Sequence, residues 1–499
     1  MMTLPHATCQ TRNVTEDEEN QAGENRSTTP ISEAFRDFIQ TGWAPVNPGS
    51  TQPFEHAPLT ALRRDRVSAQ FPHTPLIIPA GGYKQRSNDT DYPFRPHTAF
   101  TYLTGWGSDC VPDSILLGIP EGETHEWVLF PRPPAPRTSD EFYANAAIGE
   151  FWTGPRPGLA DVSSRLGLDT KDLATWDDAV SALLNRAAII READPELTAR
   201  VDQKRPGGHN DDDRLAQVIS ELRLVKDDWE VTQLRQAVAA THEGFKDIVD
   251  ALPQAIGHER GERIVEGVFH QRARLAGNDV GYGTIAASGP HACILHWVHN
   301  DGPITEGDLL LVDAGVELDT LYTADITRTL PVSGSFTPLQ RRVYEAVLEA
   351  ADQAFSVVRP GVIFRDIHQA AMEVIARSVS EWGFLPVDLD ESLSPEGQHH
   401  RRYMIHGTSH HLGLDVHDCA QARREMYLDK ELEPGMVFTI EPGLYFQPDD
   451  ESVPQEWRGI GVRIEDNILV TERGGENLSR HIPRTPDEVE KWVQQAAKQ

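Results

Sequence analysis

The sequence predicts a protein of mixed α/β (α+β) class, in which a smaller mixed domain precedes a larger domain built from two similar halves. Its 499 residues are too many for one ordinary hydrophobic core, so two or more domains are expected. A segment rich in Gly, Pro and charge, "KRPGGHNDDD" at 204–213, marks the expected boundary. After it, a pair of helices followed by strands occurs twice, which indicates a sheet backed by helices.

The helices of the larger domain are predicted from apolar residues that recur with the helical period. They are expected at 227–252, 259–277, 337–358 and 365–383. The third has a strong start signal, with Thr337 as N-cap and Pro338 at the first helical position. Strands are predicted from "YGTIAAS" to "TRTLPV" after the first pair, and from "MVFTI" to "NILVT" after the second.

The smaller domain is predicted from two buried strands, "TPLIIPAGG" and "DSILLGIP", and from "DDAVSALLNRAAII", which indicates a helix followed by a strand. The expected divisions of the chain are an acidic, flexible tail at 1–45, the smaller domain at 46–210, the larger domain at 215–485 and a C-terminal tail at 486–499. The first thirty residues lack the basic start and the apolar core of a secretory signal.

Composition argues against several classes of function. No apolar run approaches the roughly 20 residues that span a bilayer. A formal net charge of −31 repels nucleic acid and anionic membranes. The four cysteines, Cys9, Cys110, Cys293 and Cys419, form no CxxC pair, which argues against a disulfide framework and a thiolate zinc site. We therefore expect a cytoplasmic protein that binds neither nucleic acid nor membrane.

Two aspartates interrupt strand-forming sequence in "LLLVDAGVELDTLYTADITRT". Asp313 follows four apolar residues that read as a buried strand, and Asp325 lies beside Ile326 in "TADITRT". An isolated buried carboxylate is costly unless it is paired or holds a metal ion. Taken alone, each aspartate could also cap the end of its strand or form a buried salt bridge.

Three later motifs also carry ionisable groups that packing alone does not require. "HGTSHHLGLDVHD" supplies His406, His410, His411 and His417, "GMVFTIEPGLYF" supplies Glu441, and "RGIGVRIEDNILVTE" supplies Arg463 and Glu465. Simpler interpretations exist for each motif: a solvated histidine loop, a turn glutamate before Pro-Gly, and an ion pair on one face of a strand. The Gly, Thr and Ser between the first two histidines favour a loop or strand over a helix.

Considered as one set, these residues point to a metal site. Several carboxylates that gathered without a cation would repel one another strongly. Four carboxylates with one or two histidines make a hard, oxygen-rich ligand set, which favours manganese, cobalt or zinc over copper. More carboxylates than one ion requires suggests two ions bridged by shared carboxylates, an arrangement that activates water for hydrolysis.

The order Asp, Asp, His, Glu, Glu in the frames "VDAG", "ADITRT", "HGTSHHLGLDVHD", "TIEPGLY" and "GVRIED" resembles the Xaa-Pro aminopeptidases (aminopeptidase P). These enzymes belong to the pita-bread metallopeptidases, together with prolidase, methionine aminopeptidase and creatinase. An earlier segment, "KQRSNDTDYPFRPHTAFTYLTGW", is similar to the N-terminal domain of aminopeptidase P and prolidase, which methionine aminopeptidase lacks. The resemblance implies that the larger domain is a pita-bread catalytic domain with pseudo-twofold halves.

The resemblance also implies two divalent metal ions per subunit, with Mn²⁺ preferred and Co²⁺ or Zn²⁺ as alternatives. The implied metal ligands are Asp313, Asp325, His410, Glu441 and Glu465. The implied catalytic residues are His296, His417 and Glu441, and the implied substrate-binding residues are His406, Tyr445 and Arg463. In the implied mechanism, a hydroxide that bridges the two ions attacks the first peptide bond.

The implied function is release of the N-terminal residue from peptides with proline in second position. Prolidase, which shares the metal ligands, is the alternative, and an inactive pita-bread binding protein is a third possibility. A homo-oligomer of two or four subunits is usual in the family. The sequence departs from the family pattern in the interval from Asp313 to Asp325, which is one residue longer than in the family. We predict that "ELDTLYTA" forms a hairpin connection that absorbs the extra residue.

Overall fold

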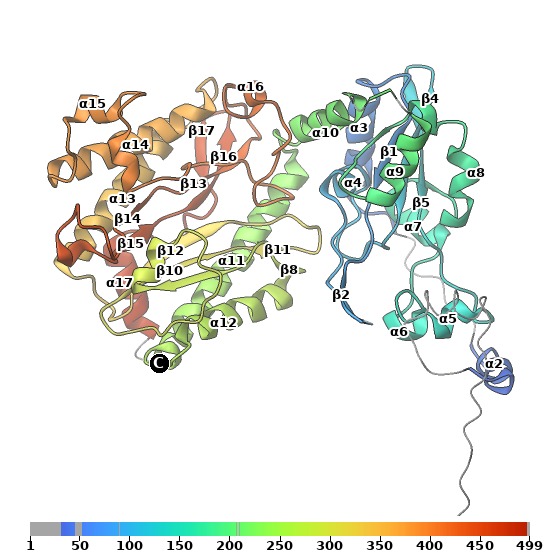
Figure 1. Ribbon diagram of the computed structural model, residues 1–499, viewed down its shortest axis with the longest axis horizontal. Helices are drawn as coiled ribbons and strands as arrows, with labels where there is room; N and C mark the ends of the chain where they lie inside the picture. Colours follow the sequence, from blue (N-terminus) through green and yellow to red (C-terminus); the bar gives the residue numbers. More distant parts are fainter. Residues whose placement is uncertain (1–30, 45–51, 89, 206, 209, 497–499) are drawn as a thin grey trace, which may run out of the picture. The chain divides into compact units, whose positions relative to one another are not determined.

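The computed structural model describes residues 31–44, 52–88, 90–205, 207–208 and 210–496. Its contacts divide the chain into two compact units, residues 1–104 with 110–208 and residues 105–109 with 209–499 (Figure 1). Helices and strands alternate in both, so the mixed α/β (α+β) class is confirmed. None of the described helices combines the length and apolarity that a membrane span requires.

The first unit is built around a five-stranded sheet with the strand order β6-β5-β4-β1-β7. Its strands are β1 (Leu76–Pro79), β4 (Ile115–Glu121), β5 (Thr124–Phe130), β6 (Asp169–Thr170) and β7 (Ala188–Ile189). The three central strands pair antiparallel, whereas the two outer strands pair in parallel with their neighbours. Ile77, Leu117 and Val128 on one sheet face pack with Trp176 in a buried apolar cluster.

Short helices and one small hairpin complete the first unit. They are α2 (Glu33–Ile39), α3 (Ala57–Ser68), β2 (Gln85–Ser87), β3 (Thr90–Asp91), α4 (Thr98–Thr104), α5 (Asp140–Ala144), α6 (Glu150–Thr153), α7 (Leu159–Leu166), α8 (Trp176–Val180) and α9 (Pro195–Lys204). The helix expected in "DDAVSALLNRAAII" is α8, which ends at Val180. A 3₁₀ turn over Leu184–Arg186 follows and leads the chain into β7, while burying Leu184 in the core.

The second unit contains the predicted repeat of a helix pair followed by strands. The first half holds α11 (Asp228–Ala255), α12 (Gly261–Ala276), β8 (Asp279–Val280), β9 (Ile285–Ser288), β10 (Leu309–Ala314), β11 (Val316–Glu317) and β12 (Ile326–Pro331). The second holds α13 (Pro338–Ser356), α14 (Phe364–Glu381), β13 (Val437–Ile440), β14 (Gly443–Tyr445), β15 (Gly461–Arg463), β16 (Asp466–Thr471) and β17 (Gly474–Asn477). The four predicted helices are therefore confirmed, with small shifts at their ends.

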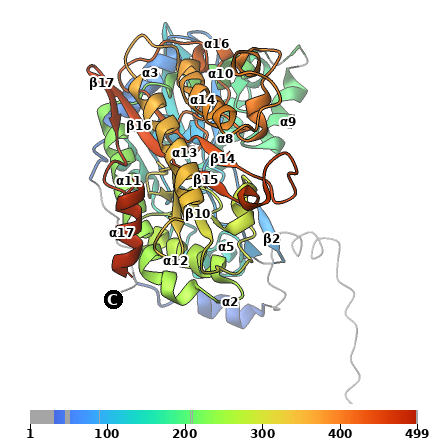
Figure 2. The same cartoon turned by 90° about the vertical axis from the view of Figure 1, so that its left-hand side faces the viewer.

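Local capping explains the start of α13. The Thr337 hydroxyl accepts a hydrogen bond from the Gln340 backbone N–H, and the Gln340 side chain accepts one from the Thr337 N–H. This reciprocal pair satisfies two backbone donors that the first turn would otherwise leave free. The helix then lies against β13, β14 and β15, in front of the strands in Figure 2.

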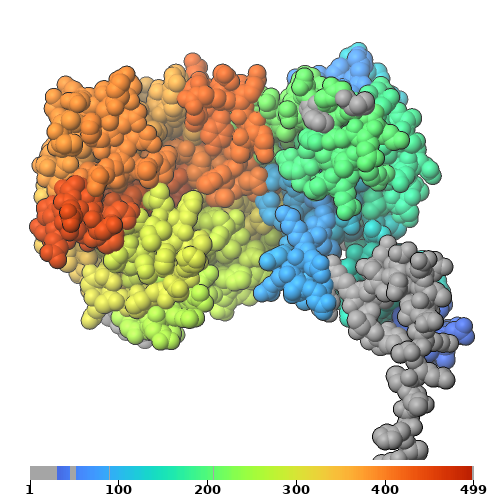
Figure 3. Space-filling model, viewed as in Figure 1, coloured from blue at the N-terminus to red at the C-terminus, as the bar shows by residue number. Residues whose placement is uncertain are grey.

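The strands of the two halves meet in the middle of the second unit. β12, β10 and β9 form one antiparallel sheet, and β13, β16 and β17 form another. They are joined where the Glu465 backbone N–H donates to the Thr327 carbonyl at 3.1 Å. In the space-filling view, the first half (green to yellow) and the second half (orange to red) lie in direct contact (Figure 3).

The structure corrects the expected tails. Residues 486–496, expected to be a C-terminal tail, form the helix α17 (Pro486–Ala496), whose Val489 and Val493 are buried against the second unit. Those valines recur one helical turn apart and supply an apolar face that a tail would leave in water. Residues 1–30 of the expected N-terminal tail lie outside the described residues, while 33–39 form α2.

Candidate active site

The two aspartates of the opening motif flank a hairpin connection. Asp313 lies in β10, Asp325 immediately precedes β12, and Asp313 pairs with Thr327 across the ladder. Glu317 and Thr323 form a bridge within the connection, and a turn closes between the Leu318 carbonyl and the Leu321 N–H at 2.8 Å. The predicted hairpin is therefore confirmed, and the strand register beyond it is intact.

The second half supplies its groups from loops and strand ends. The His410 backbone pairs with Thr439 of β13, and Glu441 is the first residue after that strand. The segment from His406 to His410 is a loop, as its small residues predicted. Glu465 was expected within a strand, but the chain leaves extended pairing at Ile464 and Glu465, between β15 and β16. This break lets the Glu465 N–H bond to Thr327 of the other half.

These side chains line one cavity of about 730 Å³. The predicted site residues on its wall are His296, Asp313, Asp325, His406, His410, His417, Glu441, Arg463 and Glu465. Tyr445 lies directly behind them, where its hydroxyl is within 2.8 Å of His406 Nε2 and accepts a hydrogen bond from Arg463 at 3.2 Å. The fold therefore brings together every residue to which the family resemblance gave a role in the site, whereas His411 does not line the cavity and stacks on Phe364 instead.

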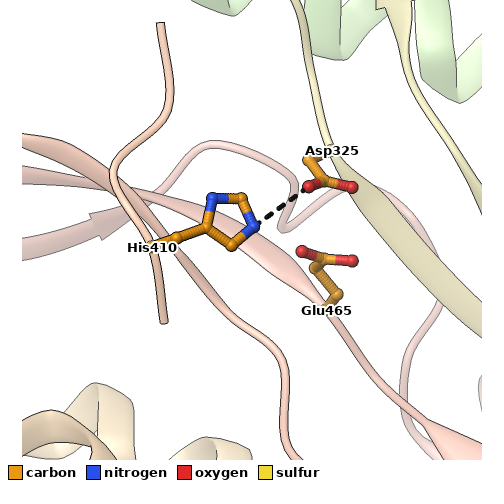
Figure 4. Close-up of side chains that lie close together, drawn as sticks. All are labelled: Asp325, His410 and Glu465. Carbon is orange, nitrogen blue, oxygen red and sulfur yellow. Dashed lines mark ion pairs between the residues drawn. The ribbon is translucent and has the colours of Figure 1, made fainter. Parts of the chain in front are cut away.

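Three of these residues form a compact donor group at the cavity wall. Asp325, His410 and Glu465 each offer one ligand atom, and these atoms lie within 4.8 Å of one another (Figure 4). His410 Nε2 is 3.2 Å from an Asp325 oxygen and 3.4 Å from a Glu441 oxygen. Glu465 Oε1 is buried and has no hydrogen-bond partner among the described residues. A buried carboxylate oxygen without a partner suits a metal ion.

The pKa values of this group reflect crowded charge. Burial, followed by repulsion from Asp325, raises the pKa of Glu465 well above its ordinary value. Burial and neighbouring carboxylates likewise raise the pKa of Asp325, and that of Glu441 to about 7. Burial alone would lower the pKa of His410, but Asp325 and Glu441 outweigh it and raise the pKa to about 9. A divalent cation would relieve this repulsion, so the donor set fits a metal.

Asp313 lies beside this group with both oxygens engaged. One oxygen accepts a hydrogen bond from the Tyr282 hydroxyl at 2.6 Å, and the other pairs with the Arg463 guanidinium at 2.6 Å. The same Tyr282 hydroxyl oxygen lies 2.5 Å from an Asp325 oxygen. Tyr282 therefore links the two aspartates that open the site.

Two histidines of the cavity are neutral at pH 7. Burial, and next the charge of Arg463, lowers the pKa of His406 to about 4. Burial, and next the neighbouring His410, lowers the pKa of His417 to about 4. The rings of His410 and His417 lie 4.3 Å apart between centroids. Each neutral imidazole can present one N–H donor and one acceptor to a bound molecule.

Sequence reasoning missed three residues that hold the site together. Tyr282 joins the aspartates, and Thr327 donates its hydroxyl to Glu465 at 2.8 Å. The buried Asn467 accepts from the Asp325 N–H and donates to the Asp325 carbonyl, which fixes that backbone. Thr327 lies within the "ADITRT" frame, where its position two residues after Asp325, on the same face of the strand, was a usable signal. Tyr282 and Asn467 carried no local signal.

Comparison with known proteins agrees with this arrangement. Residues 232–472 match metallopeptidase family M24, and residues 60–190 match the aminopeptidase P N-terminal domain. The Xaa-Pro aminopeptidase 2 of Streptomyces coelicolor is 48% identical over 93% of this chain and 96% of its own length. The Xaa-Pro aminopeptidase of Escherichia coli is 33% identical over 88% of this chain and 97% of its own.

Solved structures give the same result. Pseudomonas aeruginosa aminopeptidase PepP superimposes with a TM-score of 0.78 and 32% identity, covering 89% of this chain and 99% of that one. A variant of Escherichia coli aminopeptidase P in complex with substrate gives a TM-score of 0.77 at 32% identity, with the same coverage.

The fold and the site therefore define a metallopeptidase with an N-terminal accessory domain and a pita-bread catalytic domain. The chain belongs to the aminopeptidase P group of metallopeptidase family M24. It is a hydrolase, a metal-dependent aminopeptidase, which confirms the predicted class. The prolidase alternative is not favoured, and the inactive binding protein is set aside. The reason is that the relatives that match this chain over nearly its whole length are named as aminopeptidases.

Proposed function

We propose that this aminopeptidase releases the N-terminal residue from peptides whose second residue is proline. The observation that carries the proposal is the buried, oxygen-rich donor group beside the linked side chains of His406, Tyr445 and Arg463. Relatives with 48% and 46% identity over 93% of the chain are Xaa-Pro aminopeptidases, which supports the same specificity. Their names apply to those proteins and guide the choice of substrate here.

The metal ligands in this proposal are five. They are Asp313, Asp325, His410, Glu441 and Glu465. Their oxygen-rich chemistry suits two divalent ions, and we propose Mn²⁺, with Co²⁺ or Zn²⁺ as substitutes. When bound, such ions lower the pKa of water enough to supply hydroxide near neutral pH.

The protein groups around the ions handle protons and orientation. Glu441, whose oxygen lies 3.4 Å from His410 Nε2, would take up a proton and return it toward the leaving nitrogen. His417 is neutral and can donate an N–H to the oxygen that gains charge as the peptide bond is attacked. His296, on the cavity wall, would contact the substrate and help to move protons.

In this proposal, the pocket for the substrate proline is formed by His406, Tyr445 and Arg463. His406 Nδ1 donates to the Gly407 carbonyl at 2.7 Å, so its Nε2 accepts from the Tyr445 hydroxyl. Arg463 donates to the same hydroxyl. These hydrogen bonds fix the orientations of the two rings. A rigid, partly apolar surface suits the closed ring of a substrate proline better than it suits a residue with a flexible side chain.

A paired hydrolysis assay tests the proposal. Metal-stripped protein, reloaded with Mn²⁺, is offered Arg-Pro-Pro, Arg-Ala-Ala and Ala-Pro. We expect manganese-dependent release of arginine from Arg-Pro-Pro and little release from Arg-Ala-Ala. Equal cleavage of both tripeptides would contradict the proline preference. Cleavage of Ala-Pro alone would indicate a prolidase instead.

A matched pair of histidine variants tests one proposed role. His296 lines the cavity, whereas His299 is exposed and lies outside the residues that line it. We expect His296→Ala to lower kcat by roughly 100-fold, within the range for a proton-transfer group. His299→Ala serves as the control, and equal activities would contradict the role of His296.

The oligomeric state and location remain predictions. A homo-oligomer of two or four subunits follows from the family resemblance, and light scattering on the purified protein would measure it. A cytoplasmic location follows from the composition and from the spacing of the cysteines.

A further inference from the structure

The segment that carries His296 has little secondary structure of its own. Between the end of β9 at Ser288 and Gly302 it contains only a 3₁₀ turn over Gly289–Cys293. A side chain on such a segment holds a fixed position only if other groups anchor the backbone. The anchor lies on α12, of which no described residue lines the cavity.

Glu262, in the first turn of α12, is completely buried and accepts four hydrogen bonds. Its Oε1 accepts from the Ser288 backbone N–H and from His291 Nδ1, each at 2.8 Å. Its Oε2 accepts from Trp297 Nε1 at 2.9 Å and from the Gly302 N–H at 2.8 Å. The donors lie at both ends of the segment and within it, so a single carboxylate ties the whole segment together.

The surrounding contacts are close and specific. The rings of His291 and Trp297 stack with centroids 3.9 Å apart and an interplanar angle of 25°. A Cβ on Gly302 would lie 2.6 Å from the His291 ring and 2.9 Å from Glu262 Oε2. The carboxylate can therefore reach the backbone here only because residue 302 has no side chain.

A second anchor fixes the far end of the segment. Asn300 is buried and adopts φ 47°, a left-handed conformation that asparagine tolerates better than most residues. Its side chain accepts from the Ala286 N–H at 2.9 Å and donates to the Thr284 carbonyl at 2.8 Å. The end of the segment is thus tied to β9, and the part between the anchors has little freedom.

The geometry points to Glu262 as a positioning residue for His296. Trp297 turns its indole N–H toward Glu262, while its neighbours Leu295, His296 and Val298 line the cavity. We propose that the Glu262 anchor holds the segment so that the His296 imidazole faces the substrate. This inference rests on the substrate role proposed for His296 above. Glu262 touches neither the cavity nor the metal-binding group, so it acts through the segment.

A double-mutant cycle tests the inference with Mn²⁺-loaded protein and Arg-Pro-Pro. Glu262→Gln keeps the shape of the side chain but turns an NH₂ group toward two of the four donors. We expect it to lower kcat by roughly 10- to 100-fold, the range for a catalytic group displaced by about 1 Å. In the His296→Ala background the same substitution should cost less than about threefold, because coupled residues are not additive.

Two controls separate positioning from general damage. Glu266→Gln, one helical turn further along α12, should retain full activity, and the metal content of Glu262→Gln should equal that of the unchanged protein. If Glu262→Gln does not accumulate as folded protein, Trp297→Phe removes one donor, keeps an aromatic ring and should give a smaller loss that also disappears in the His296→Ala background.

The outcomes distinguish the inference from the function on which it rests. Equal fold-losses for Glu262→Gln with and without His296 would overturn the inference and leave the role of His296 intact. A loss explained by reduced metal content would also overturn it. A fully active His296→Ala variant would overturn the role of His296 and the inference with it.

Discussion

Glu465 and Asp466 are adjacent, almost equally buried, and electrostatically opposite. Glu465 faces the cavity, where one oxygen accepts from Thr327 and the other has no partner among the described residues. Asp466 faces the other way and accepts from Arg328 at 2.8 Å and Ser479 at 2.7 Å, with Arg484 at 3.0 Å. Burial would raise the pKa of both, but the two arginines lower that of Asp466, whereas that of Glu465 is raised.

The two neighbours differ in whether the protein supplies a positive charge beside the buried carboxylate. Arg328 is completely buried, and all five of its N–H groups point to acceptors, including the Glu465 carbonyl and Asp466. The protein itself therefore supplies the cation for Asp466. For Glu465 it supplies none at the free oxygen, and that charge requires an ion from outside.

The largest effect should follow from Glu465→Gln. Loss of this proposed metal ligand should lower kcat by more than about 100-fold, the upper range for partners outside the ligand shell. Metal content measured after dialysis should fall in parallel. In the metal-free state the variant should be at least as stable as the unchanged protein, because one repelling charge is gone. A fully active, metal-loaded variant would contradict this.

Asp466→Asn should have the opposite signature. It leaves Arg328 and Arg484 without their buried anion, and the loss of one partner of such a pair costs about 3–5 kcal/mol. We therefore expect a clear fall in Tm with and without metal, measured by calorimetry. Folded variant should still bind metal. An unchanged Tm would show that the contrast between the two neighbours has been overstated.

Removal of the metal should make the free energy of unfolding depend on pH through Glu441. Without metal, the folded-state pKa of Glu441 is about 7, above an unfolded value of about 4.3. Between these values the folded form binds more protons than the unfolded form, so stability falls as pH rises. A bound ion offsets the negative charge, so the Tm difference between Mn²⁺-loaded and chelator-treated protein should widen with rising pH. In the Glu441→Gln variant, this Tm difference should increase less with rising pH. A Tm difference that does not vary with pH would contradict the prediction.

The smallest effect should come from an ion pair in water. Arg235 and Glu476 form a bidentate pair at 2.7 and 2.8 Å, but their side chains are 44% and 37% exposed. Exposed pairs contribute at most about 1 kcal/mol. Glu476→Gln should therefore shift Tm by far less than Asp466→Asn in the same buffer, and an equal shift would remove burial as the cause of the contrast.

The residues proposed as metal ligands could be predicted from the sequence because each carries a local signal. Asp313 and Glu441 stand at strand ends after apolar runs, and the small residues before His410 predict its loop. The same reasoning misjudged Glu465, which it placed inside a strand, and residues 486–496, which form a helix. Strand continuity depends on partners: Thr327, which accepts from the Glu465 N–H, lies 138 residues away.

By itself, the sequence determined the mixed class, the two similar halves, the hairpin between the aspartates and the metallopeptidase chemistry. These features depend on periodicity, turn residues and residue types within short stretches of chain. Only the tertiary structure decided which carboxylate receives an arginine and which lacks a partner, and which anchors fix Asp325 and the His296 segment. Hydrogen bonds and charge pairing act over a few ångströms, and folding alone brings Glu262 to Trp297 or Asn467 to Asp325.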